Sequence, residues 1–136
     1  MPRIYKRCNN CSNYIISEIP CFLIAENEEF FSFLDVRPMQ KGHVLVIPKN
    51  EVDYLFDMDS DEYQRFFLFA RQVAGAIKKA VPCKKVGLAV VGLEVPHAHI
   101  HLVPLNEVGD MVFGKHLDVS KEEMEKIAKE IQSYLK

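Results

Sequence analysis

The segment from Val95 to Pro104 reads V-P-H-A-H-I-H-L-V-P and carries three of the five histidines in the chain at alternate positions. Apolar residues separate them, which is typical of a β-strand, where successive side chains point to opposite faces. The spacing therefore predicts that His97, His99 and His101 share one face. Buried imidazoles need hydrogen-bond partners and titrate near neutral pH, so the row indicates a chemical site within a sheet.

Three explanations of this histidine row are open. Chance clustering on a surface disagrees with the apolar residues between the histidines. A single zinc ion cannot reach all three, because the outer pair would lie about 13 Å apart on a strand and zinc–nitrogen bonds are only about 2 Å long. A catalytic zinc would need a further ligand from His43 or His116. The third explanation is nucleophilic: a neutral imidazole can attack phosphorus while its neighbours hydrogen-bond the phosphoryl oxygens.

Composition bounds the kind of protein. The 136 residues are enough for one domain, and 49% hydrophobic with 26% charged residues is ordinary for a globular chain. A net charge of −2 gives no general attraction to nucleic acid or to anionic membranes. No apolar run approaches the roughly 20 residues that span a bilayer. We therefore expect a cytoplasmic protein, with neither nucleic acid nor membrane as a partner, whose cysteines are thiols or metal ligands.

The order of apolar patterns predicts an α+β fold with an antiparallel sheet of about five strands. The expected strands cover residues 21–25, 30–35, 43–47, 85–91 and 96–104. One long helix is expected from a capping box at Asp59 and Glu62 to Ala80. A second, charged helix over 120–135 begins with the same pattern at Ser120. The long helix has a wide apolar face, which fits either a deep core or a subunit interface.

Two blocks of the sequence resemble the histidine-triad (HIT) family. The run H-A-H-I-H-L-V over residues 97–103 is similar to the family signature of alternate histidines among apolar residues. Residues 33–38 and 42–49 resemble the first half of the family's domain, and the similarity runs from about residue 8 to residue 104. We therefore expect residues 1–136 to form a single domain with a C-terminal extension. The resemblance implies a nucleotide-binding fold, usually a homodimer, whose members cleave purine nucleotide substrates at the α-phosphate.

The resemblance also implies roles for individual residues. His99 would be the nucleophile that becomes transiently nucleotidylated, and the other catalytic histidines would contact phosphate and support this chemistry; they are His43, His97 and His101. Asp35 would accept hydrogen bonds from the ribose hydroxyls, as a carboxylate does well. Val36 and Val95 would contact the nucleotide. No cofactor is required for this reaction.

The loop before the triad departs from the family pattern. Most members have a longer loop that ends in Gly-Gln-Ser or Gly-Gln-Thr, whereas here Glu94 stands where the Ser or Thr is expected. A carboxylate beside an α-phosphate is unfavourable at low dielectric. Glu94 therefore either points outward, binds a cationic leaving group, or is protonated and acts as a general acid.

A structural zinc site is a separate possibility. Cys8 and Cys11 have metal-ligand spacing, although one Cys-x-x-Cys is a weak signal on its own. In relatives that bind zinc, two further ligands align with Glu51 and His97 of this chain. A Cys₂-Glu-His site is chemically allowed.

Two classes of function follow. The first is a nucleotidyl hydrolase or transferase, with nucleoside phosphoramidates such as an adenylylated amine as the leading substrates and dinucleoside polyphosphates as the alternative. The second is a nucleotide-binding adaptor with little turnover, which the Glu94 replacement and the short loop leave open. A zinc enzyme that uses the triad is a third possibility, and it predicts loss of activity with chelators.

Overall fold

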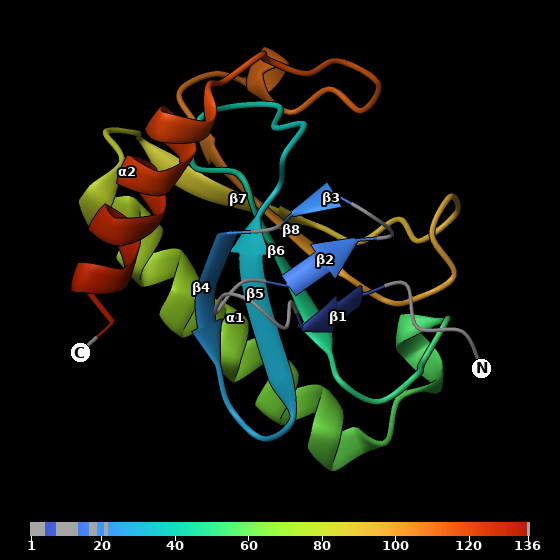
Figure 1. Ribbon diagram of the computed structural model, residues 1–136. Coiled ribbons are helices and arrows are strands. Elements are labelled where there is room, and N and C mark those ends of the chain that lie inside the picture. Colours follow the sequence, from blue (N-terminus) through green and yellow to red (C-terminus); the bar gives the residue numbers. More distant parts are fainter. Residues whose placement is uncertain (1–4, 8–13, 17–18, 21, 136) are drawn as a thin grey trace.

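A computed structural model describes the backbone of residues 5–7, 14–16 and 19–20, and residues 22–135 in full. Five strands form an antiparallel sheet in the order β4-β5-β6-β8-β7, and two helices complete the expected α+β architecture (Figure 1). The strands are β4 (Phe22–Glu26), β5 (Phe30–Leu34), β6 (Val44–Pro48), β7 (Lys85–Ala89) and β8 (Ile100–Leu105). The helices are α1 (Ser60–Ala80) and α2 (Lys121–Ser133), with short 3₁₀ turns η1 (Leu55–Asp57) and η2 (Val108–Asp110).

The two faces of the sheet have different partners. Alternate residues of β5, β6 and β8 face α1 and α2 and form the larger core, which includes Phe30, Val46 and Ile100. The intervening residues face the other way and form a smaller apolar cluster of Phe31, Phe33, Leu45 and Ile47. Because β5 and β6 are buried throughout, both faces of the sheet centre are covered.

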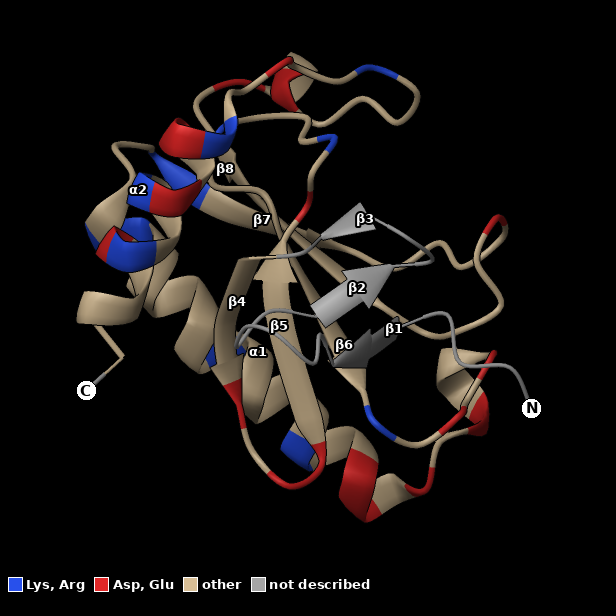
Figure 2. Cartoon of the chain, in the orientation of Figure 1, with Lys and Arg blue, Asp and Glu red and all other residues tan. Residues whose placement is uncertain are grey.

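Local sequence explains most element boundaries. Asn27 closes the β4–β5 turn, since its side-chain oxygen accepts hydrogen bonds from the backbone N–H groups of Glu29 and Phe30. Helix α2 begins as expected, with the Ser120 hydroxyl accepting from the Glu123 N–H at 3.2 Å. Neither helix of the described chain combines the length and apolarity needed to cross a bilayer. Figure 2 shows acidic and basic residues mixed along α2, and acidic residues around η1 and the start of α1.

Two local expectations were wrong, and one small sheet was not expected at all. The capping box at the start of α1 does not form: Asp59 accepts from Asp61 N–H, while Glu62 is buried and accepts from the Asn50 side chain. The strand expected over 85–91 ends at Ala89. A three-stranded sheet of β1 (Tyr5–Arg7), β2 (Tyr14–Ile16) and β3 (Ile19–Pro20) was not expected, because elements of two or three residues show no measurable periodicity.

Candidate active site

One row of cross-strand partners leads from apolar residues to the triad. Phe33 of β5 lies opposite Leu45 of β6, and Leu45 lies opposite His101 of β8. Directly opposed residues on antiparallel strands share a face, so His101 lies on the side of the smaller apolar cluster, away from the helices. The row continues to Ala89 of β7, which lies opposite His101, so the sheet presents a polar ring within an otherwise apolar row.

Strand β8 begins later than the sequence predicted. It starts at Ile100, which lies opposite Val46, so His97 and His99 precede the ladder. The physical reason is that the chain diverges from β6 here: Ala98 N–H donates to the carbonyl of Val52 in the following loop at 2.7 Å. The imidazoles of His99 and His101 nevertheless lie together, with ring centroids 4.8 Å apart.

A chain of hydrogen bonds assigns the tautomers of His43 and His101. The backbone N–H of Met39 donates to Nδ1 of His43 at 3.0 Å, so that nitrogen carries a lone pair. The proton of neutral His43 is therefore on Nε2, which donates to Nδ1 of His101 at 3.0 Å. His101 in turn must carry its proton on Nε2. We call the path from the Met39 amide through His43 to His101 the histidine relay.

His99 is set in the opposite tautomer. Its Nδ1 lies 2.8 Å from the carbonyl oxygen of His97, which can only accept, so Nδ1 carries the proton. Neutral His99 therefore has its lone pair on Nε2. Burial is the main cause that lowers the pKa of His99, and it lowers the pKa of His43 to about 3 and of His101 to about 4. At neutral pH the site combines an Nε2 lone pair on His99 with an Nε2–H donor on His101.

The carboxylate of Asp35 lies beside the histidine relay, next to His43. Its Oδ1 accepts from the backbone N–H of Arg37 at 2.8 Å, and its Oδ2 is 3.6 Å from Nε2 of His43, which is too long for a hydrogen bond. Since His43 is neutral at pH 7, this contact is not an ion pair. Burial raises the pKa of Asp35 to about 6, against smaller opposing effects of Arg37 and His116. The carboxylate keeps acceptor capacity for a ligand.

The same side chains have the composition of a metal site. One ligand atom each from Asp35, His43 and His101 lie within 4.8 Å of one another. Metal binding at Nε2 of His43 would need the proton on Nδ1, where it would oppose the N–H of Met39. The histidine relay therefore explains the convergence of these groups better than a metal does.

The remaining predicted residues have different surroundings. His97 is buried and its Nε2 donates to the carbonyl oxygen of Pro48 at 2.8 Å. Glu94 is exposed on the loop before the triad, and Val95 packs against the smaller apolar cluster. Val36 packs against the helix-facing core and is only partly buried, so its contact with a nucleotide stays a prediction. Glu51 is exposed, and Cys8 and Cys11 lie outside the described residues.

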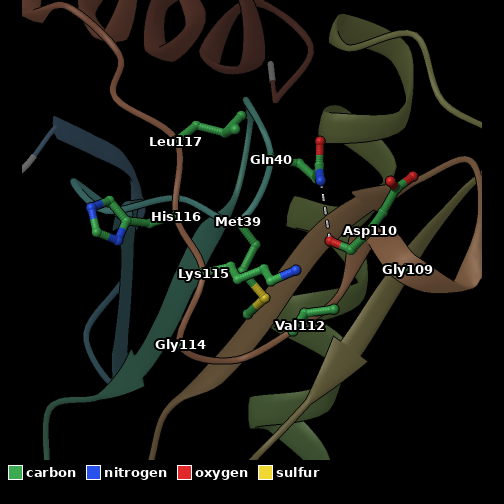
Figure 3. A pocket seen from close by; sticks show the side chains of 9 residues that line it. All are labelled: Met39, Gln40, Gly109, Asp110, Val112, Gly114, Lys115, His116 and Leu117. Carbon is green, nitrogen blue, oxygen red and sulfur yellow. Dashed lines mark hydrogen bonds between the residues drawn. The ribbon is translucent and has the colours of Figure 1, made fainter.

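Sequence reasoning missed the segment between η2 and α2. Apart from His116 as a possible zinc ligand, no role was expected there, yet the ring of Phe113 contacts the ring of His101 at a centroid distance of 5.0 Å. The same segment and the Met39–Gln40 turn enclose a pocket of about 470 Å³, into which Figure 3 shows the Lys115 side chain pointing. His116 acts electrostatically on Asp35. No pattern of residues signals these contacts, because the segment has neither helical nor strand periodicity.

Known proteins match both the sequence and the fold. The HIT domain model matches residues 16–108. An uncharacterised HIT-like protein of Methanocaldococcus jannaschii is 33% identical over 128 residues, which cover 87% of this chain and 94% of that protein. An adenosine 5′-monophosphoramidase of Schizosaccharomyces pombe is 29% identical, with 88% and 92% covered.

Two further matches bear on substrate and architecture. A bis(5′-nucleosyl)-tetraphosphatase of the same yeast is 32% identical over 54% of this chain and 43% of that protein. The crystal structure of a Hit-like protein involved in cell-cycle regulation from Bartonella henselae superposes with a TM-score of 0.73 at 26% identity, covering 87% of this chain and 89% of that one.

Proposed function

This chain belongs to the histidine-triad (HIT) family, and we propose that it is a nucleotide hydrolase that cleaves purine nucleoside phosphoramidates at the α-phosphate. Relatives named as an adenosine phosphoramidase and as a nucleosyl-tetraphosphatase support hydrolysis of nucleotides. The single observation that carries the proposal is the pair of opposite tautomers. His99 offers a lone pair on Nε2 next to an N–H donor on His101.

The reaction runs in two displacements. The Nε2 lone pair of His99 forms a bond to the α-phosphorus while the bond from phosphorus to the amine nitrogen breaks, and the amine leaves with a proton from a general acid at the leaving group, the role proposed for Glu94. The adduct places positive charge on the imidazole, which the carbonyl of His97 stabilises through Nδ1–H. Water then attacks phosphorus, the P–Nε2 bond breaks, and the water proton replaces the one that the amine carried away. The products are the nucleoside monophosphate, the amine and neutral His99.

The histidine relay would stabilise the charge that develops on the phosphoryl oxygens. The proton on Nε2 of His101 is held there by the donor from His43, which the Met39 amide fixes in turn. A donor whose tautomer is set before substrate arrives does not reorganise during the reaction. The low pKa values of His43 and His101 keep both rings neutral, so the direction of the relay is maintained across physiological pH.

Asp35 would bind the ribose hydroxyls, and Glu94 would act at the leaving group. Asp35 lies next to the relay with acceptor capacity to spare. Glu94 is exposed at the rim and has room to meet a cationic amine or to deliver a proton to it. In a Glu94→Gln variant we expect altered preference among amine leaving groups and a changed pH–rate profile. An unchanged profile and preference would remove Glu94 from the reaction.

Hydrolysis of defined substrates tests the proposal. Adenosine 5′-phosphoramidate and a lysine-linked adenylate are incubated with the wild-type protein and with His99→Gln, and release of AMP is followed by chromatography. We expect turnover by the wild type and a loss of at least about a thousandfold without the nucleophile. Equal AMP release by both proteins, or binding of AMP without any turnover, would refute the enzyme and favour a nucleotide-binding adaptor.

Dinucleoside polyphosphates are the second candidate substrates. The match to a tetraphosphatase favours them, although it covers about half of this chain. The same displacement would expel a nucleoside polyphosphate, which is already a good leaving group and needs no proton. The ratio of kcat/KM for the phosphoramidate and for diadenosine tetraphosphate decides between the two classes.

We propose further that the protein is a homodimer joined through β7 and α1. Among the described strands, β7 pairs only with β8, which leaves its outer edge able to bond another strand. An apolar groove of about 600 Å³ runs beside it, and its lining includes Phe67 together with Leu68 (57% exposed) and Leu88 (46% exposed). A second copy would cover both the groove and the strand edge.

A further inference from the structure

We propose that Phe113 is a positioning residue for His101, holding the imidazole of the histidine relay in place and excluding water from it. This inference deepens the proposed function and rests on it for its catalytic consequence. Phe113 lies outside the family's two motif blocks, on the segment that connects η2 to α2.

The contact has the geometry of a specific aromatic pair. The two ring centroids are 5.0 Å apart and the ring planes are inclined by 83°, which is an edge-on arrangement. His101 is otherwise bounded by His43, which donates to its Nδ1, and by His99 at a centroid distance of 4.8 Å. Phe113 is therefore an apolar boundary of a ring whose other described aromatic neighbours are histidines.

The backbone presents Phe113 in a defined turn. The N–H of Lys115 donates to the carbonyl of Val112 at 3.3 Å, and Gly114 has a φ of +94°. A positive φ at the third residue is the mark of a type II turn, with Phe113 at the second position. No heavy atom lies within 4 Å of a Cβ built on Gly114, so glycine is required there by conformation alone.

Two hydrogen bonds attach this turn to the loop that carries the relay. The N–H of Leu117 donates to the carbonyl of Pro38 at 2.7 Å, and the Gln40 side chain donates to the carbonyl of Asp110 at 3.3 Å (Figure 3). Met39, whose amide begins the relay, stands between these two attachment points. The turn that presents Phe113 and the loop that fixes His43 are thus bound to each other.

Phe113 itself remains 47% exposed, so it is not simply a core residue. A half-exposed phenyl ring contributes less to stability through burial than a phenyl ring in the core does. The feature that sets Phe113 apart from other exposed apolar residues is its contact with the buried imidazole of His101. Removing the ring would open His101 to solvent on that side. The charged and titratable groups that face His101 are His43, His99 and Asp35, and none of them would change in such a variant.

Substitution of Phe113 gives the test. For Phe113→Ala we expect kcat with adenosine 5′-phosphoramidate to fall on the order of tenfold, with KM changed by less than about twofold. Because burial is the main cause of the low pKa of His101, the acid limb that His101 contributes, below the one set by Asp35, should move toward neutral pH. Phe113→Leu should retain most of the activity, since it keeps an apolar cover. Phe56→Ala, which removes another exposed aromatic ring on η1, is the matched control.

Two measurements keep the proposal falsifiable. Gly114→Ala leaves the phenyl ring but strains the turn, so we expect it to change kcat and the pH profile in the same direction as Phe113→Ala. The ¹⁵N titration of the His101 side chain should show a higher pKa in Phe113→Ala than in the wild type, and this readout needs no turnover. If the His101 titration is the same in both proteins, the proposal is overturned. If the wild type hydrolyses no nucleotide but the titration shifts, only the proposed function fails.

Discussion

At the scale of single residues, hydrogen-bond partners decide which imidazole can act as a nucleophile. His99 and His101 are two residues apart and similarly buried, yet a carbonyl fixes one ring and a relay beginning at an amide fixes the other. The outcome is opposite tautomers, with the lone pair on Nε2 of His99. Sequence spacing predicted the row of His97, His99 and His101, and the family resemblance added His43 and Asp35 as candidates. Neither could predict Met39, because that residue contributes only its backbone N–H.

Asp35 carries a residue-scale prediction about pH. Its pKa of about 6 lies above the ordinary 3.8, because burial disfavours the charged form. Between these values the folded chain binds a proton that the unfolded chain has lost, so its contribution to stability decreases as pH rises through this window. Ribose binding needs the ionised form, so we expect kcat/KM to fall as pH drops below about 6.

The Asp35→Asn variant separates this effect from titration of the histidines. We expect it to be more stable than the wild type above pH 6, to lose about 10–100-fold in kcat/KM at pH 8, and to lack the acid limb near pH 6. The comparison uses pH–rate profiles and urea denaturation of both proteins. An acid limb near pH 6 that persists in the variant would assign that limb to another group.

At the scale of elements, strand pairing accounts for more of the site than local propensity does. The hairpin β4–β5, the buried strand β6 and both helices follow from patterns that can be read in the sequence. The late start of β8 does not, because it depends on a hydrogen bond from Ala98 to the distant Val52. The segment around Phe113 is likewise held by partners at Pro38 and Gln40. Such contacts are set by tertiary structure and leave no local signal.

Gly42 carries an element-scale prediction about stability. It precedes His43 with a φ of +94°, and an added Cβ would lie 2.8 Å from Cγ2 of Val81. We expect Gly42→Ala to lower the free energy of unfolding by about 1–3 kcal/mol and to reduce activity by displacing His43. Gly75, in the middle of α1 with no heavy atom within 4 Å of an added Cβ, is the matched control. Gly75→Ala should be stabilising by about 0.5–1 kcal/mol.

Chemical denaturation of Gly42→Ala and Gly75→Ala measures the change in the free energy of unfolding of each variant. A Gly42→Ala protein as stable as the wild type would mean that the turn before β6 accepts a side chain, and that backbone conformation does not constrain His43.

At the scale of the whole molecule, the sheet separates two surfaces. The helix-facing core includes buried apolar residues of α1 and α2, whereas the opposite face carries His101 within a row of apolar residues. Helix α1 and strand β7 together present the apolar groove outside this site. The sequence predicted the wide apolar face of α1. It could not tell which residues of that face belong to the core and which stay exposed for an interface, because periodicity does not reveal which of them lie beside the edge of a strand.

The dimer is tested by a charge placed in the groove. We expect Leu88→Lys to convert a dimer into a monomer in sedimentation velocity experiments, because a buried ammonium without a partner is costly. Val108→Lys, at an exposed position on η2, should leave the assembly unchanged. A wild-type protein that sediments as a monomer at micromolar concentration would contradict the proposed interface.

The structural zinc site remains a prediction for the whole chain. If Cys8, Cys11, Glu51 and His97 bind zinc, the purified protein should contain about one zinc ion per chain, and Cys8→Ser should lose it. Absence of zinc, with freely reactive thiols, would refute the site. Activity is expected to survive chelation, since no step of the proposed reaction uses a metal.

The proposed reaction requires a covalent bond between His99 and the α-phosphorus, and mass spectrometry of the quenched reaction can detect it. The wild-type protein is mixed with adenosine 5′-phosphoramidate, quenched in alkali within the first turnover, digested and mapped. We expect one adenylyl group on the peptide that contains His99, bound at Nε2, and no such adduct in His99→Gln. Rapid AMP release with no adduct, or an adduct on another residue while His99→Gln stays active, would contradict it.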